Sequence, residues 1–440
     1  MVLMAKPKKK YDELTKLEIK YIKKLLNITK IQDLDIALLK NLKEKLKEIK
    51  DKRNKNMISF KLWDIIMCVI IASFADNDTW EEIQEFVEEN YKWFKSFLQM
   101  TGGVPKADSY ERIMGLVDHE VLNSILLDFF YAITLNTSNE DDILNLDGRL
   151  NNGSKRKKTV INEAIKSLNC LNVYSLAKNY CINTIPIDNK TNEIPTIREY
   201  LKDKNFKGKI ITVDALNTQK ENVKAVIDAH ADYVFPIKGN QEDLKNNLKE
   251  YFNQDKCDEI IAGNSKSEYE IYYEKSHGQI IKYEYFQTSD IEWYDRTHTW
   301  EGLQSIGLVR KTITMMAQVN NERKNAKKKK IEKEITTIEE RYYISSLNVD
   351  VKRFSKIIRS HWSVENKIHW HLDYTFNQDR NKTTNKNALL NLEIIHKFVL
   401  AVLEKTKPKY NRSLIRIRKH LGRNIEEYFT ELACFLIVSR

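Results

Sequence analysis

The sequence predicts a mixed α/β protein that begins with a helical region. Between about residues 140 and 252, short runs rich in Ile and Val alternate with amphipathic stretches, the pattern of strands and helices in a mixed sheet. Before this part, apolar residues recur every three or four positions, which predicts helices. A second β-rich stretch at 265–347 precedes a return to helical spacing.

The composition favours a polyanionic partner. The chain has 440 residues, and its 73 Lys and Arg against 62 Asp and Glu give a net charge of +11. Five cysteines at wide spacings, without a CxxC pair, predict reduced thiols rather than a zinc site. The most apolar run, 62–75, is too short and contains a charge, so we expect a soluble, cytoplasmic protein with no membrane partner.

The first part of the chain is predicted to be helical throughout. Residues 1–56 are predicted to form a basic, charged arm with Leu and Ile stripes. Two interpretations fit this pattern equally: an arm that is only solvated and an arm that contacts DNA. Residues 57–136 have helical spacing, broken at Gly102–Pro105, and predict a compact helical domain.

Two aspartates follow apolar strands in the α/β part. The alternation of Ile143–Asp147 ends at Gly148, and the buried strand Lys209–Asp214 also ends on an aspartate. Either aspartate alone could be a turn former or a helix cap. Because sites in α/β sheets gather at the carboxyl ends of strands, we expect Asp147 and Asp214 to be neighbours. Further strands are predicted at 173–176, 182–187 and 233–238, and helices at 218–229 and 244–252.

The following stretch, 265–347, is predicted to be mainly β. Candidate strands are 269–273, 281–286, 306–309, 312–316, 335–338 and 341–347. A very basic loop, 323–330, interrupts them and is expected to be exposed. Helices resume at 351–360, and a second basic patch follows Pro408 in the tail.

The segment Arg359–Asp373 is the densest in groups that can hold a metal or a proton. At helical spacing His361, Glu365, His369 and Asp373 line one face, while Val364, Ile368 and Leu372 form a neighbouring stripe directed to a core. Amphipathic packing alone would also explain this pattern. A zinc site made by the two histidines and Glu365 is a further alternative, but it has no evident fourth ligand and leaves the strand-end aspartates unexplained.

Three carboxylates gathered at one point need positive charge between them. Mg²⁺ is suited to this role because it prefers hard oxygen ligands and keeps open positions for phosphate oxygens. Paired metal ions can activate an attacking oxygen and stabilise a leaving one in phosphodiester chemistry. Two strand-end aspartates and a later helical glutamate, in a basic chain, therefore favour metal-dependent chemistry on nucleic acid.

At this point the sequence resembles the DDE transposases of bacterial insertion sequences, specifically the H-repeat-associated family. The matching segments are short but run in order along most of the chain: Ser73–Ala75, Thr79–Ile83, Gly103–Pro105 with Arg112, Leu146–Gly148, Lys190–Ile194, Thr212–Ala215 with Gln219, Ala231–Val234, Lys238–Gln241, His277–Gly278, Tyr343–Leu347, and Arg359, His361–Trp362, Glu365–Asn366, His369–Trp370 and Leu372–Asp373.

The resemblance implies a ribonuclease H-like core, interrupted by a β-rich insertion, in which Asp147, Asp214 and Glu365 are the catalytic, metal-binding triad. It implies two Mg²⁺ ions, with Mn²⁺ as a substitute, that support cleavage at element ends and strand transfer into target DNA. His361 and His369 would lie beside the metals or face DNA. Phosphate contacts would come from Lys238, Arg359 and Lys367.

The expected division of the chain follows from the same resemblance. It comprises a basic arm (1–56), a helical domain with DNA-end binding (57–136), the first part of the catalytic core (140–264), the insertion (265–347), the second part of the core (348–405) and a basic tail (406–440). The implied partner is double-stranded DNA, bound by a homodimer in the bacterial nucleoid.

Several positions depart from the family pattern. Arg149 stands where Lys usually follows Asp-Gly, Asn152 replaces a basic residue, Gln279 replaces Arg, and Gln378 replaces an acid. A catalytically silent DNA-binding derivative and a less specific Mg²⁺-dependent nuclease on the same scaffold are therefore the alternatives to an active transposase.

Overall fold

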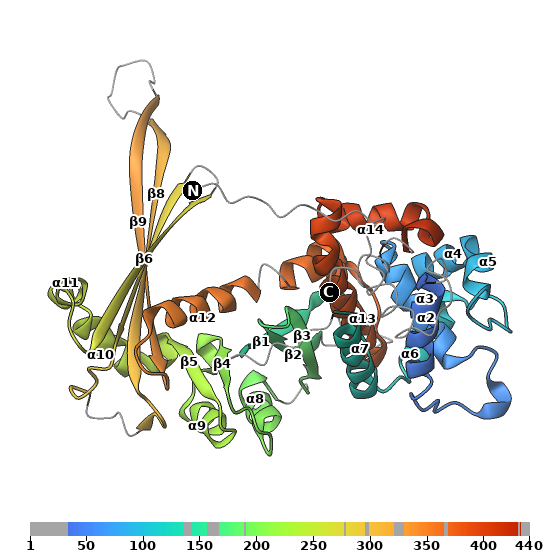
Figure 1. Ribbon diagram of the computed structural model, residues 1–440, viewed down its shortest axis with the longest axis horizontal. Coiled ribbons are helices and arrows are strands. Elements are labelled where there is room, and N and C mark those ends of the chain that lie inside the picture. Colours follow the sequence, from blue (N-terminus) through green and yellow to red (C-terminus); the bar gives the residue numbers. More distant parts are fainter. Residues whose placement is uncertain are drawn as a thin grey trace, which may run out of the picture.

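The structure is a computed structural model that describes residues 34–134, 142–155, 167–188, 191–276, 279–294, 299–320, 330–364, 368–429 and 432. A long mixed sheet runs through the molecule and a bundle of helices lies at one end of it (Figure 1). The predicted mixed α/β class is confirmed. No helix among the described residues is long and apolar enough to cross a membrane.

The sheet has nine strands in the order β3-β2-β1-β4-β5-β9-β8-β7-β6. Its first half consists of β1 (Asp142–Asn151), β2 (Leu168–Ser175), β3 (Tyr180–Pro186), β4 (Lys209–Val213) and β5 (Asp232–Ile237). The strands β1, β2 and β3 are antiparallel neighbours, whereas β4 and β5 run parallel to β1. This arrangement agrees with the expected ribonuclease H-like core.

Helices cover both faces of this half of the sheet. On one face lie α8 (Glu193–Leu201), α9 (Lys220–Asp228), α10 (Glu242–Tyr251) and α11 (Gln254–Ala262), whose apolar residues share a core with Leu146, Val213 and Phe235. The other face is covered by α12 (Val351–Val364), which packs Phe354 and Ile357 against Ile143 and Ile210.

The insertion continues the same sheet. Its strands β6 (Ser267–Ser276), β7 (Gln279–Thr288), β8 (Ser305–Asn320) and β9 (Lys330–Ser345) pair antiparallel in sequence order, and β9 pairs with β5. The strands β8 and β9 project from the molecule as a long ribbon (Figure 1). The predicted basic loop lies outside the described residues, except for Lys330, which begins β9.

Four strand predictions in the insertion were wrong in their extent. The separate strands predicted at 306–309 and 312–316 are one strand, β8. Those predicted at 335–338 and 341–347 are also one strand, β9, which ends at Ser345. Charged residues interrupt the apolar pattern in both strands, but they pair across the ladder. Arg310 stands opposite Glu340 and donates from Nε to Oε1 at 2.9 Å, so the charges are satisfied without ending the strand.

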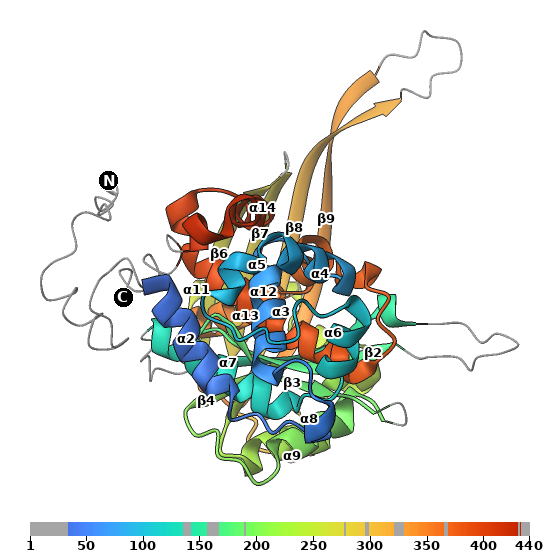
Figure 2. The same cartoon turned by 90° about the vertical axis from the view of Figure 1, so that its right-hand side faces the viewer.

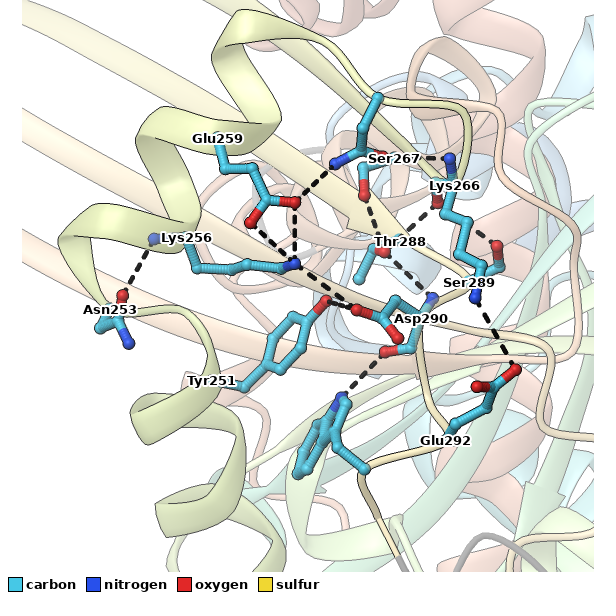
Figure 3. Close-up of polar contacts among 12 residues, drawn as sticks. Tyr251, Asn253, Lys256, Glu259, Lys266, Ser267, Thr288, Ser289, Asp290 and Glu292 are labelled. Atoms are coloured by element: carbon cyan, nitrogen blue, oxygen red, sulfur yellow. Dashed lines mark hydrogen bonds and ion pairs between the residues drawn. The ribbon is translucent and has the colours of Figure 1, made fainter.

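A polar cluster fastens α10 and α11 to the base of the insertion (Figure 3). The Lys256 ammonium lies 3.0 Å from Glu259 and 3.5 Å from Asp290, and the Tyr251 hydroxyl donates to Asp290 at 2.9 Å. The Ser267 hydroxyl at the start of β6 donates to Thr288 Oγ1 at the end of β7. These contacts fix the position at which the insertion leaves the first half of the sheet.

The helical end of the molecule is built from both ends of the chain (Figures 1 and 2). Its members are α2 (Leu34–Leu46), α3 (Leu62–Phe74), α4 (Trp80–Glu89), α5 (Tyr91–Lys95), α6 (Ala107–Met114), α7 (His119–Thr134), α13 (Lys386–Tyr410) and α14 (Leu414–Arg423). The helix α3 is apolar on all sides because α2, α4, α6, α13 and α14 surround it. The helix α13 also packs against β2 and β3, which joins this helical core to the sheet.

We expect Gly307→Ala to lower the free energy of unfolding by about 1–3 kcal/mol through overpacking. A methyl group at Gly307 in β8 would lie 2.3 Å from Cζ of the buried Phe354 and 2.9 Å from the carbonyl oxygen of Phe286. Urea unfolding measures the effect. Gly239→Ala is the matched control, because a methyl group there meets no atom within 4 Å. Equal stability of both variants would contradict the packing described for β8 and α12.

Candidate active site

The two predicted aspartates are neighbours at one edge of the parallel strand pair. The last parallel pair between β1 and β4 is Leu146 with Val213, and the next residue on each strand is Asp147 or Asp214. Asp214 ends its strand as predicted, directly after β4. The Asp147 prediction was wrong in one respect, since β1 continues to Asn151. The strand β2 supplies the partners for this extension and pairs Asn172 with Asp147.

Asp214 is exposed and is oriented by a histidine from α12. The Nε2 atom of His361 lies 3.4 Å from Oδ1 of Asp214, and its Nδ1 atom lies 2.9 Å from the Thr212 hydroxyl. Thr212 in turn donates to Oδ1 of Asn145 at 2.6 Å. The hydrogen bond from His361 lowers the pKa of Asp214 below its ordinary value, so this carboxylate is held in its charged form.

Asp147 is mostly buried and is contacted by the second predicted histidine. The Nδ1 atom of His369 lies 3.5 Å from Oδ2 of Asp147. Burial lowers the pKa of His369 to about 4, with a further contribution from Arg149, so the imidazole is neutral at physiological pH. Its Nε2 atom has no hydrogen-bond partner among the described residues.

The segment that carries these histidines is not one regular helix. The α-helix α12 ends at Val364, and His371–Thr375 form a π-helical turn. The predicted orientation nevertheless holds for the described residues, because Ile368 and Leu372 are buried. Asp373, one turn beyond His369, accepts a hydrogen bond from Arg149, which lies on the same face of β1 as Asp147.

Glu365 and Lys367 lie outside the described residues, so their predicted roles stay predictions. His361 contacts Asp214 and His369 contacts Asp147, and the zinc hypothesis, which also needs Glu365, stays a hypothesis. No group of three or more His, Cys, Asp and Glu able to hold a metal occurs among the described residues. Asp147 and Asp214 supply hard oxygen donors side by side, which fits two of the three expected Mg²⁺ ligands.

A cleft of about 510 Å³ opens beside the aspartates. Lys238, predicted to contact phosphate, lines this cleft with Asp147, Asp214 and His361. Arg359 does not line it, since its guanidinium lies 5.0 Å from the ring of Tyr272 in the insertion. The charged cleft residues Lys245, Glu339, Glu340 and Arg341, and Trp362 beside them, were not predicted as site residues. The Arg341 guanidinium lies 5.0 Å from the Trp362 ring, a contact between β9 and α12 that sequence spacing does not reveal.

Sequence reasoning also missed a buried chain of hydrogen bonds and ion pairs that begins at Arg149, two residues after Asp147. We call this chain of contacts the relay. Nη1 of Arg149 donates to Oε1 of Gln378 at 2.8 Å, and Nε2 of Gln378 contacts Nδ1 of His396 at 2.8 Å. The other ring nitrogen of His396 lies 3.2 Å from Asp78, which also accepts from Arg418 of α14. Arginine can only donate hydrogen bonds, so the atom of Gln378 that faces Arg149 is the amide oxygen. The amide nitrogen of Gln378 then donates to Nδ1 of His396, which is neutral and carries its proton on Nε2.

A second branch of buried charges supports Arg149 from α13. Glu393 lies 3.4 Å from Arg149 and 2.7 Å from Lys397, and Lys397 donates to the Thr184 hydroxyl at 2.9 Å on β3. Burial alone would raise the pKa of Glu393, but Lys397 and Arg149 lower it below its ordinary value. The strand β1, which carries Asp147, is therefore fixed to α13 by paired charges rather than by apolar contacts alone.

The relay predicts a dependence of stability on pH. Burial lowers the pKa of His396 below its ordinary value of 6.5, although Asp78 and Glu393 oppose this and Arg418 adds to it. The unfolded chain therefore binds a proton that the folded chain does not. The free energy of unfolding is not reduced by this group above the pKa that His396 has in the unfolded chain. Below that pKa the free energy of unfolding falls as the pH decreases, by up to about 1.4 kcal/mol per pH unit. We expect urea unfolding at about pH 7.5 and about pH 5.5 to show this loss.

In His396→Gln the same comparison should give a smaller loss, because the residue that takes up the proton is gone. His230→Gln, which changes an exposed histidine of the α9–β5 loop, should keep the dependence of the native chain. Identical pH dependence in the native chain and in His396→Gln would contradict a neutral, buried His396.

Comparison with known proteins agrees with the geometry of the site. The Transposase DDE domain family model matches residues 142–402, and the DDE_Tnp_1-associated model matches residues 43–130. The chain belongs to the Transposase DDE domain family.

Among three similar curated proteins, two are named as putative transposases. The "H repeat-associated putative transposase YhhI" of Escherichia coli (strain K12) is 29% identical over 353 residues, which cover 80% of this chain and 86% of that protein. "Putative protein YbfL" of the same strain has the same identity and coverage. The "Putative transposase YncI" of Escherichia coli O157:H7 is 27% identical over 374 residues, covering 84% and 88%.

Proposed function

We propose that this transposase-family protein cleaves DNA strands at the ends of a mobile element and joins the freed 3′-hydroxyl to target DNA, in a metal-dependent reaction. The observation that supports this most directly is the pair Asp147 and Asp214, placed side by side at the open cleft. Glu365 follows α12 directly in the sequence and completes the proposed triad. The substrate would be double-stranded chromosomal DNA, bound by two copies of the chain.

The side chains of the site have distinct proposed roles. Asp147, Asp214 and Glu365 would hold divalent metal ions, which when bound activate a water molecule and stabilise the leaving oxygen. His361 keeps Asp214 charged and oriented. Lys238, Lys245 and Arg341 are the candidates for contacts with the DNA phosphates, which position the strand without reading its sequence. Arg341 also lies 3.8 Å from Glu339, which lines the cleft together with Glu340.

Strand cleavage of a supercoiled plasmid that carries the element's own ends tests the proposal. We expect nicks at the ends with Mg²⁺ and none with EDTA, and joined products when target DNA is added. Nicks at sites unrelated to the ends would favour a less specific nuclease. Binding of DNA without any metal-dependent cleavage would leave a silent DNA-binding derivative as the function.

A further inference from the structure

The basic tail separates into one buried arginine and a row of exposed cations. Arg412, Arg416, Lys419 and Arg423 are all exposed, and we call them the α14 ridge. The spacing of Arg416, Lys419 and Arg423, three and four residues, places them on one side of α14, and Arg412 lies just before the helix, two residues ahead of Leu414. The opposite side of α14 is buried through Leu414, Ile417 and Leu421.

The α14 ridge is compensated within the described part of the chain at one position, where Asp76 interacts electrostatically with Lys419. None of the four side chains forms an ion pair with another described residue, and neighbours along the ridge repel one another one turn apart. Arg418, on the buried side of the same helix, lies 3.1 Å from Asp76 and also contacts Asp78. The acids that follow, Glu426 and Glu427, are exposed in the next helical turn, 425–429. The fold thus pairs the buried cation directly and leaves most of the charge of the ridge for an external anion.

The helix that carries the ridge is firmly docked. The guanidinium of Arg418 donates to the carbonyl oxygen of Ser73 from both Nε (3.0 Å) and Nη2 (2.8 Å), and it lies 4.1 Å from the ring of Phe376. Through Asp78 it joins the relay that begins at Arg149 on β1. Figures 1 and 2 place α14 on the side of the molecule from which β8 and β9 project, and α9 on the opposite side. The ridge is therefore a pre-formed surface with a fixed relation to the active site.

We propose that the α14 ridge binds the phosphate backbone of double-stranded DNA without reading its sequence. This proposal rests on the proposed function, which supplies DNA as the substrate. Cations repeated along a helix can each neutralise a phosphate and release condensed counterions. An anionic membrane is disfavoured as the partner, since a surface-binding helix inserts an apolar face, and the apolar face of α14 is buried in the core.

The experiment compares duplex binding by two variants with the same change in charge. In the ridge variant Arg412, Arg416, Lys419 and Arg423 are replaced by Gln. In the control, Lys202, Lys207, Lys220 and Lys224, exposed around α8 and α9, are replaced by Gln. Fluorescence anisotropy with a labelled duplex of arbitrary sequence gives Kd between about 50 and about 200 mM salt.

The ridge variant should lose affinity at least about tenfold, and its slope of log K against log salt should shrink by about 0.9 for each lost contact, up to about 3.6. The control should keep the slope of the native chain. Equal loss in both variants would reduce the effect to net charge and overturn the proposal, as would unchanged binding by the ridge variant. Tighter binding of the native chain to phosphatidylglycerol vesicles than to the duplex would overturn it as well.

A measurement on the unaltered chain covers the case in which a variant folds poorly. Acetylation of Lys419, followed by mass spectrometry, should be suppressed by added duplex, whereas acetylation of Lys220 on α9 should not. Lack of protection at Lys419 would overturn the proposal. Because neither test requires cleavage, failure of the proposed catalysis with intact ridge binding is distinguishable from failure of the ridge itself.

Discussion

Asp147→Asn and Asp214→Asn are each expected to reduce the rate of DNA strand cleavage by at least about a thousandfold. Each substitution keeps the size of the side chain but removes a negative oxygen ligand, and the transition-state stabilisation supplied by a bound metal is worth several kcal/mol. Nicking of a supercoiled plasmid with the element's ends, measured under single-turnover conditions, gives the rate. The duplex affinity of both variants should stay within a few fold of the native value.

Asp228→Asn is the matched control for this prediction. Asp228 is an exposed aspartate of α9, paired at 3.3 Å with Lys224, and lies on no element of the site. It should leave the cleavage rate unchanged. Full activity in either Asp147→Asn or Asp214→Asn would remove that residue from the proposed triad, and equal losses in all three variants would point to a general effect on the fold.

Arg418→Met is expected to lower the free energy of unfolding by about 3–5 kcal/mol. The side chain of Arg418 is fully buried, and its removal would leave Asp78 inside the protein without a compensating cation. Urea unfolding with a tertiary-structure probe measures the loss. Arg416→Met makes the same chemical change on the exposed face of the same helix and should stay within about 0.5 kcal/mol of the native chain.

A double substitution separates the lost ion pair from lost packing. If the buried charge of Asp78 causes most of the effect, Asp78→Asn added to Arg418→Met should recover part of the stability, giving a coupling energy of at least about 0.5 kcal/mol. Additive effects of the two substitutions, or an Arg418→Met variant as stable as Arg416→Met, would show that the contact contributes little.

The sequence predicted the position of the aspartates well because both depend on local pattern. A short apolar run before Asp214 gives a strand that ends there, and the parallel pairing of β1 with β4 follows from the α/β order. The continuation of β1 beyond Gly148 could not be predicted. Arg149 looks like an exposed residue, and it is buried only because Gln378 and Glu393, more than two hundred positions away, supply its partners.

The same contact explains two departures from the family pattern. In the sequence, Arg149 in place of Lys and Gln378 in place of an acid look like separate losses. In the structure these two side chains are hydrogen-bonded to each other. A neutral amide can accept from the arginine and donate to His396 at the same time, which an ionised carboxylate cannot do. Pairing between distant positions is not visible in one sequence, so these substitutions could be interpreted only from the structure.

The helical core has a consequence for how the protein is made. Its central helix, α3, is translated long before α13 and α14, which cover much of its surface. Until α13 and α14 are made, the nascent chain must carry an almost wholly apolar helix that lacks two of the five helices that pack around it, a state prone to aggregation. Premature termination before α13 would therefore leave an N-terminal fragment that cannot complete this core, even though every residue of α2 to α7 is present.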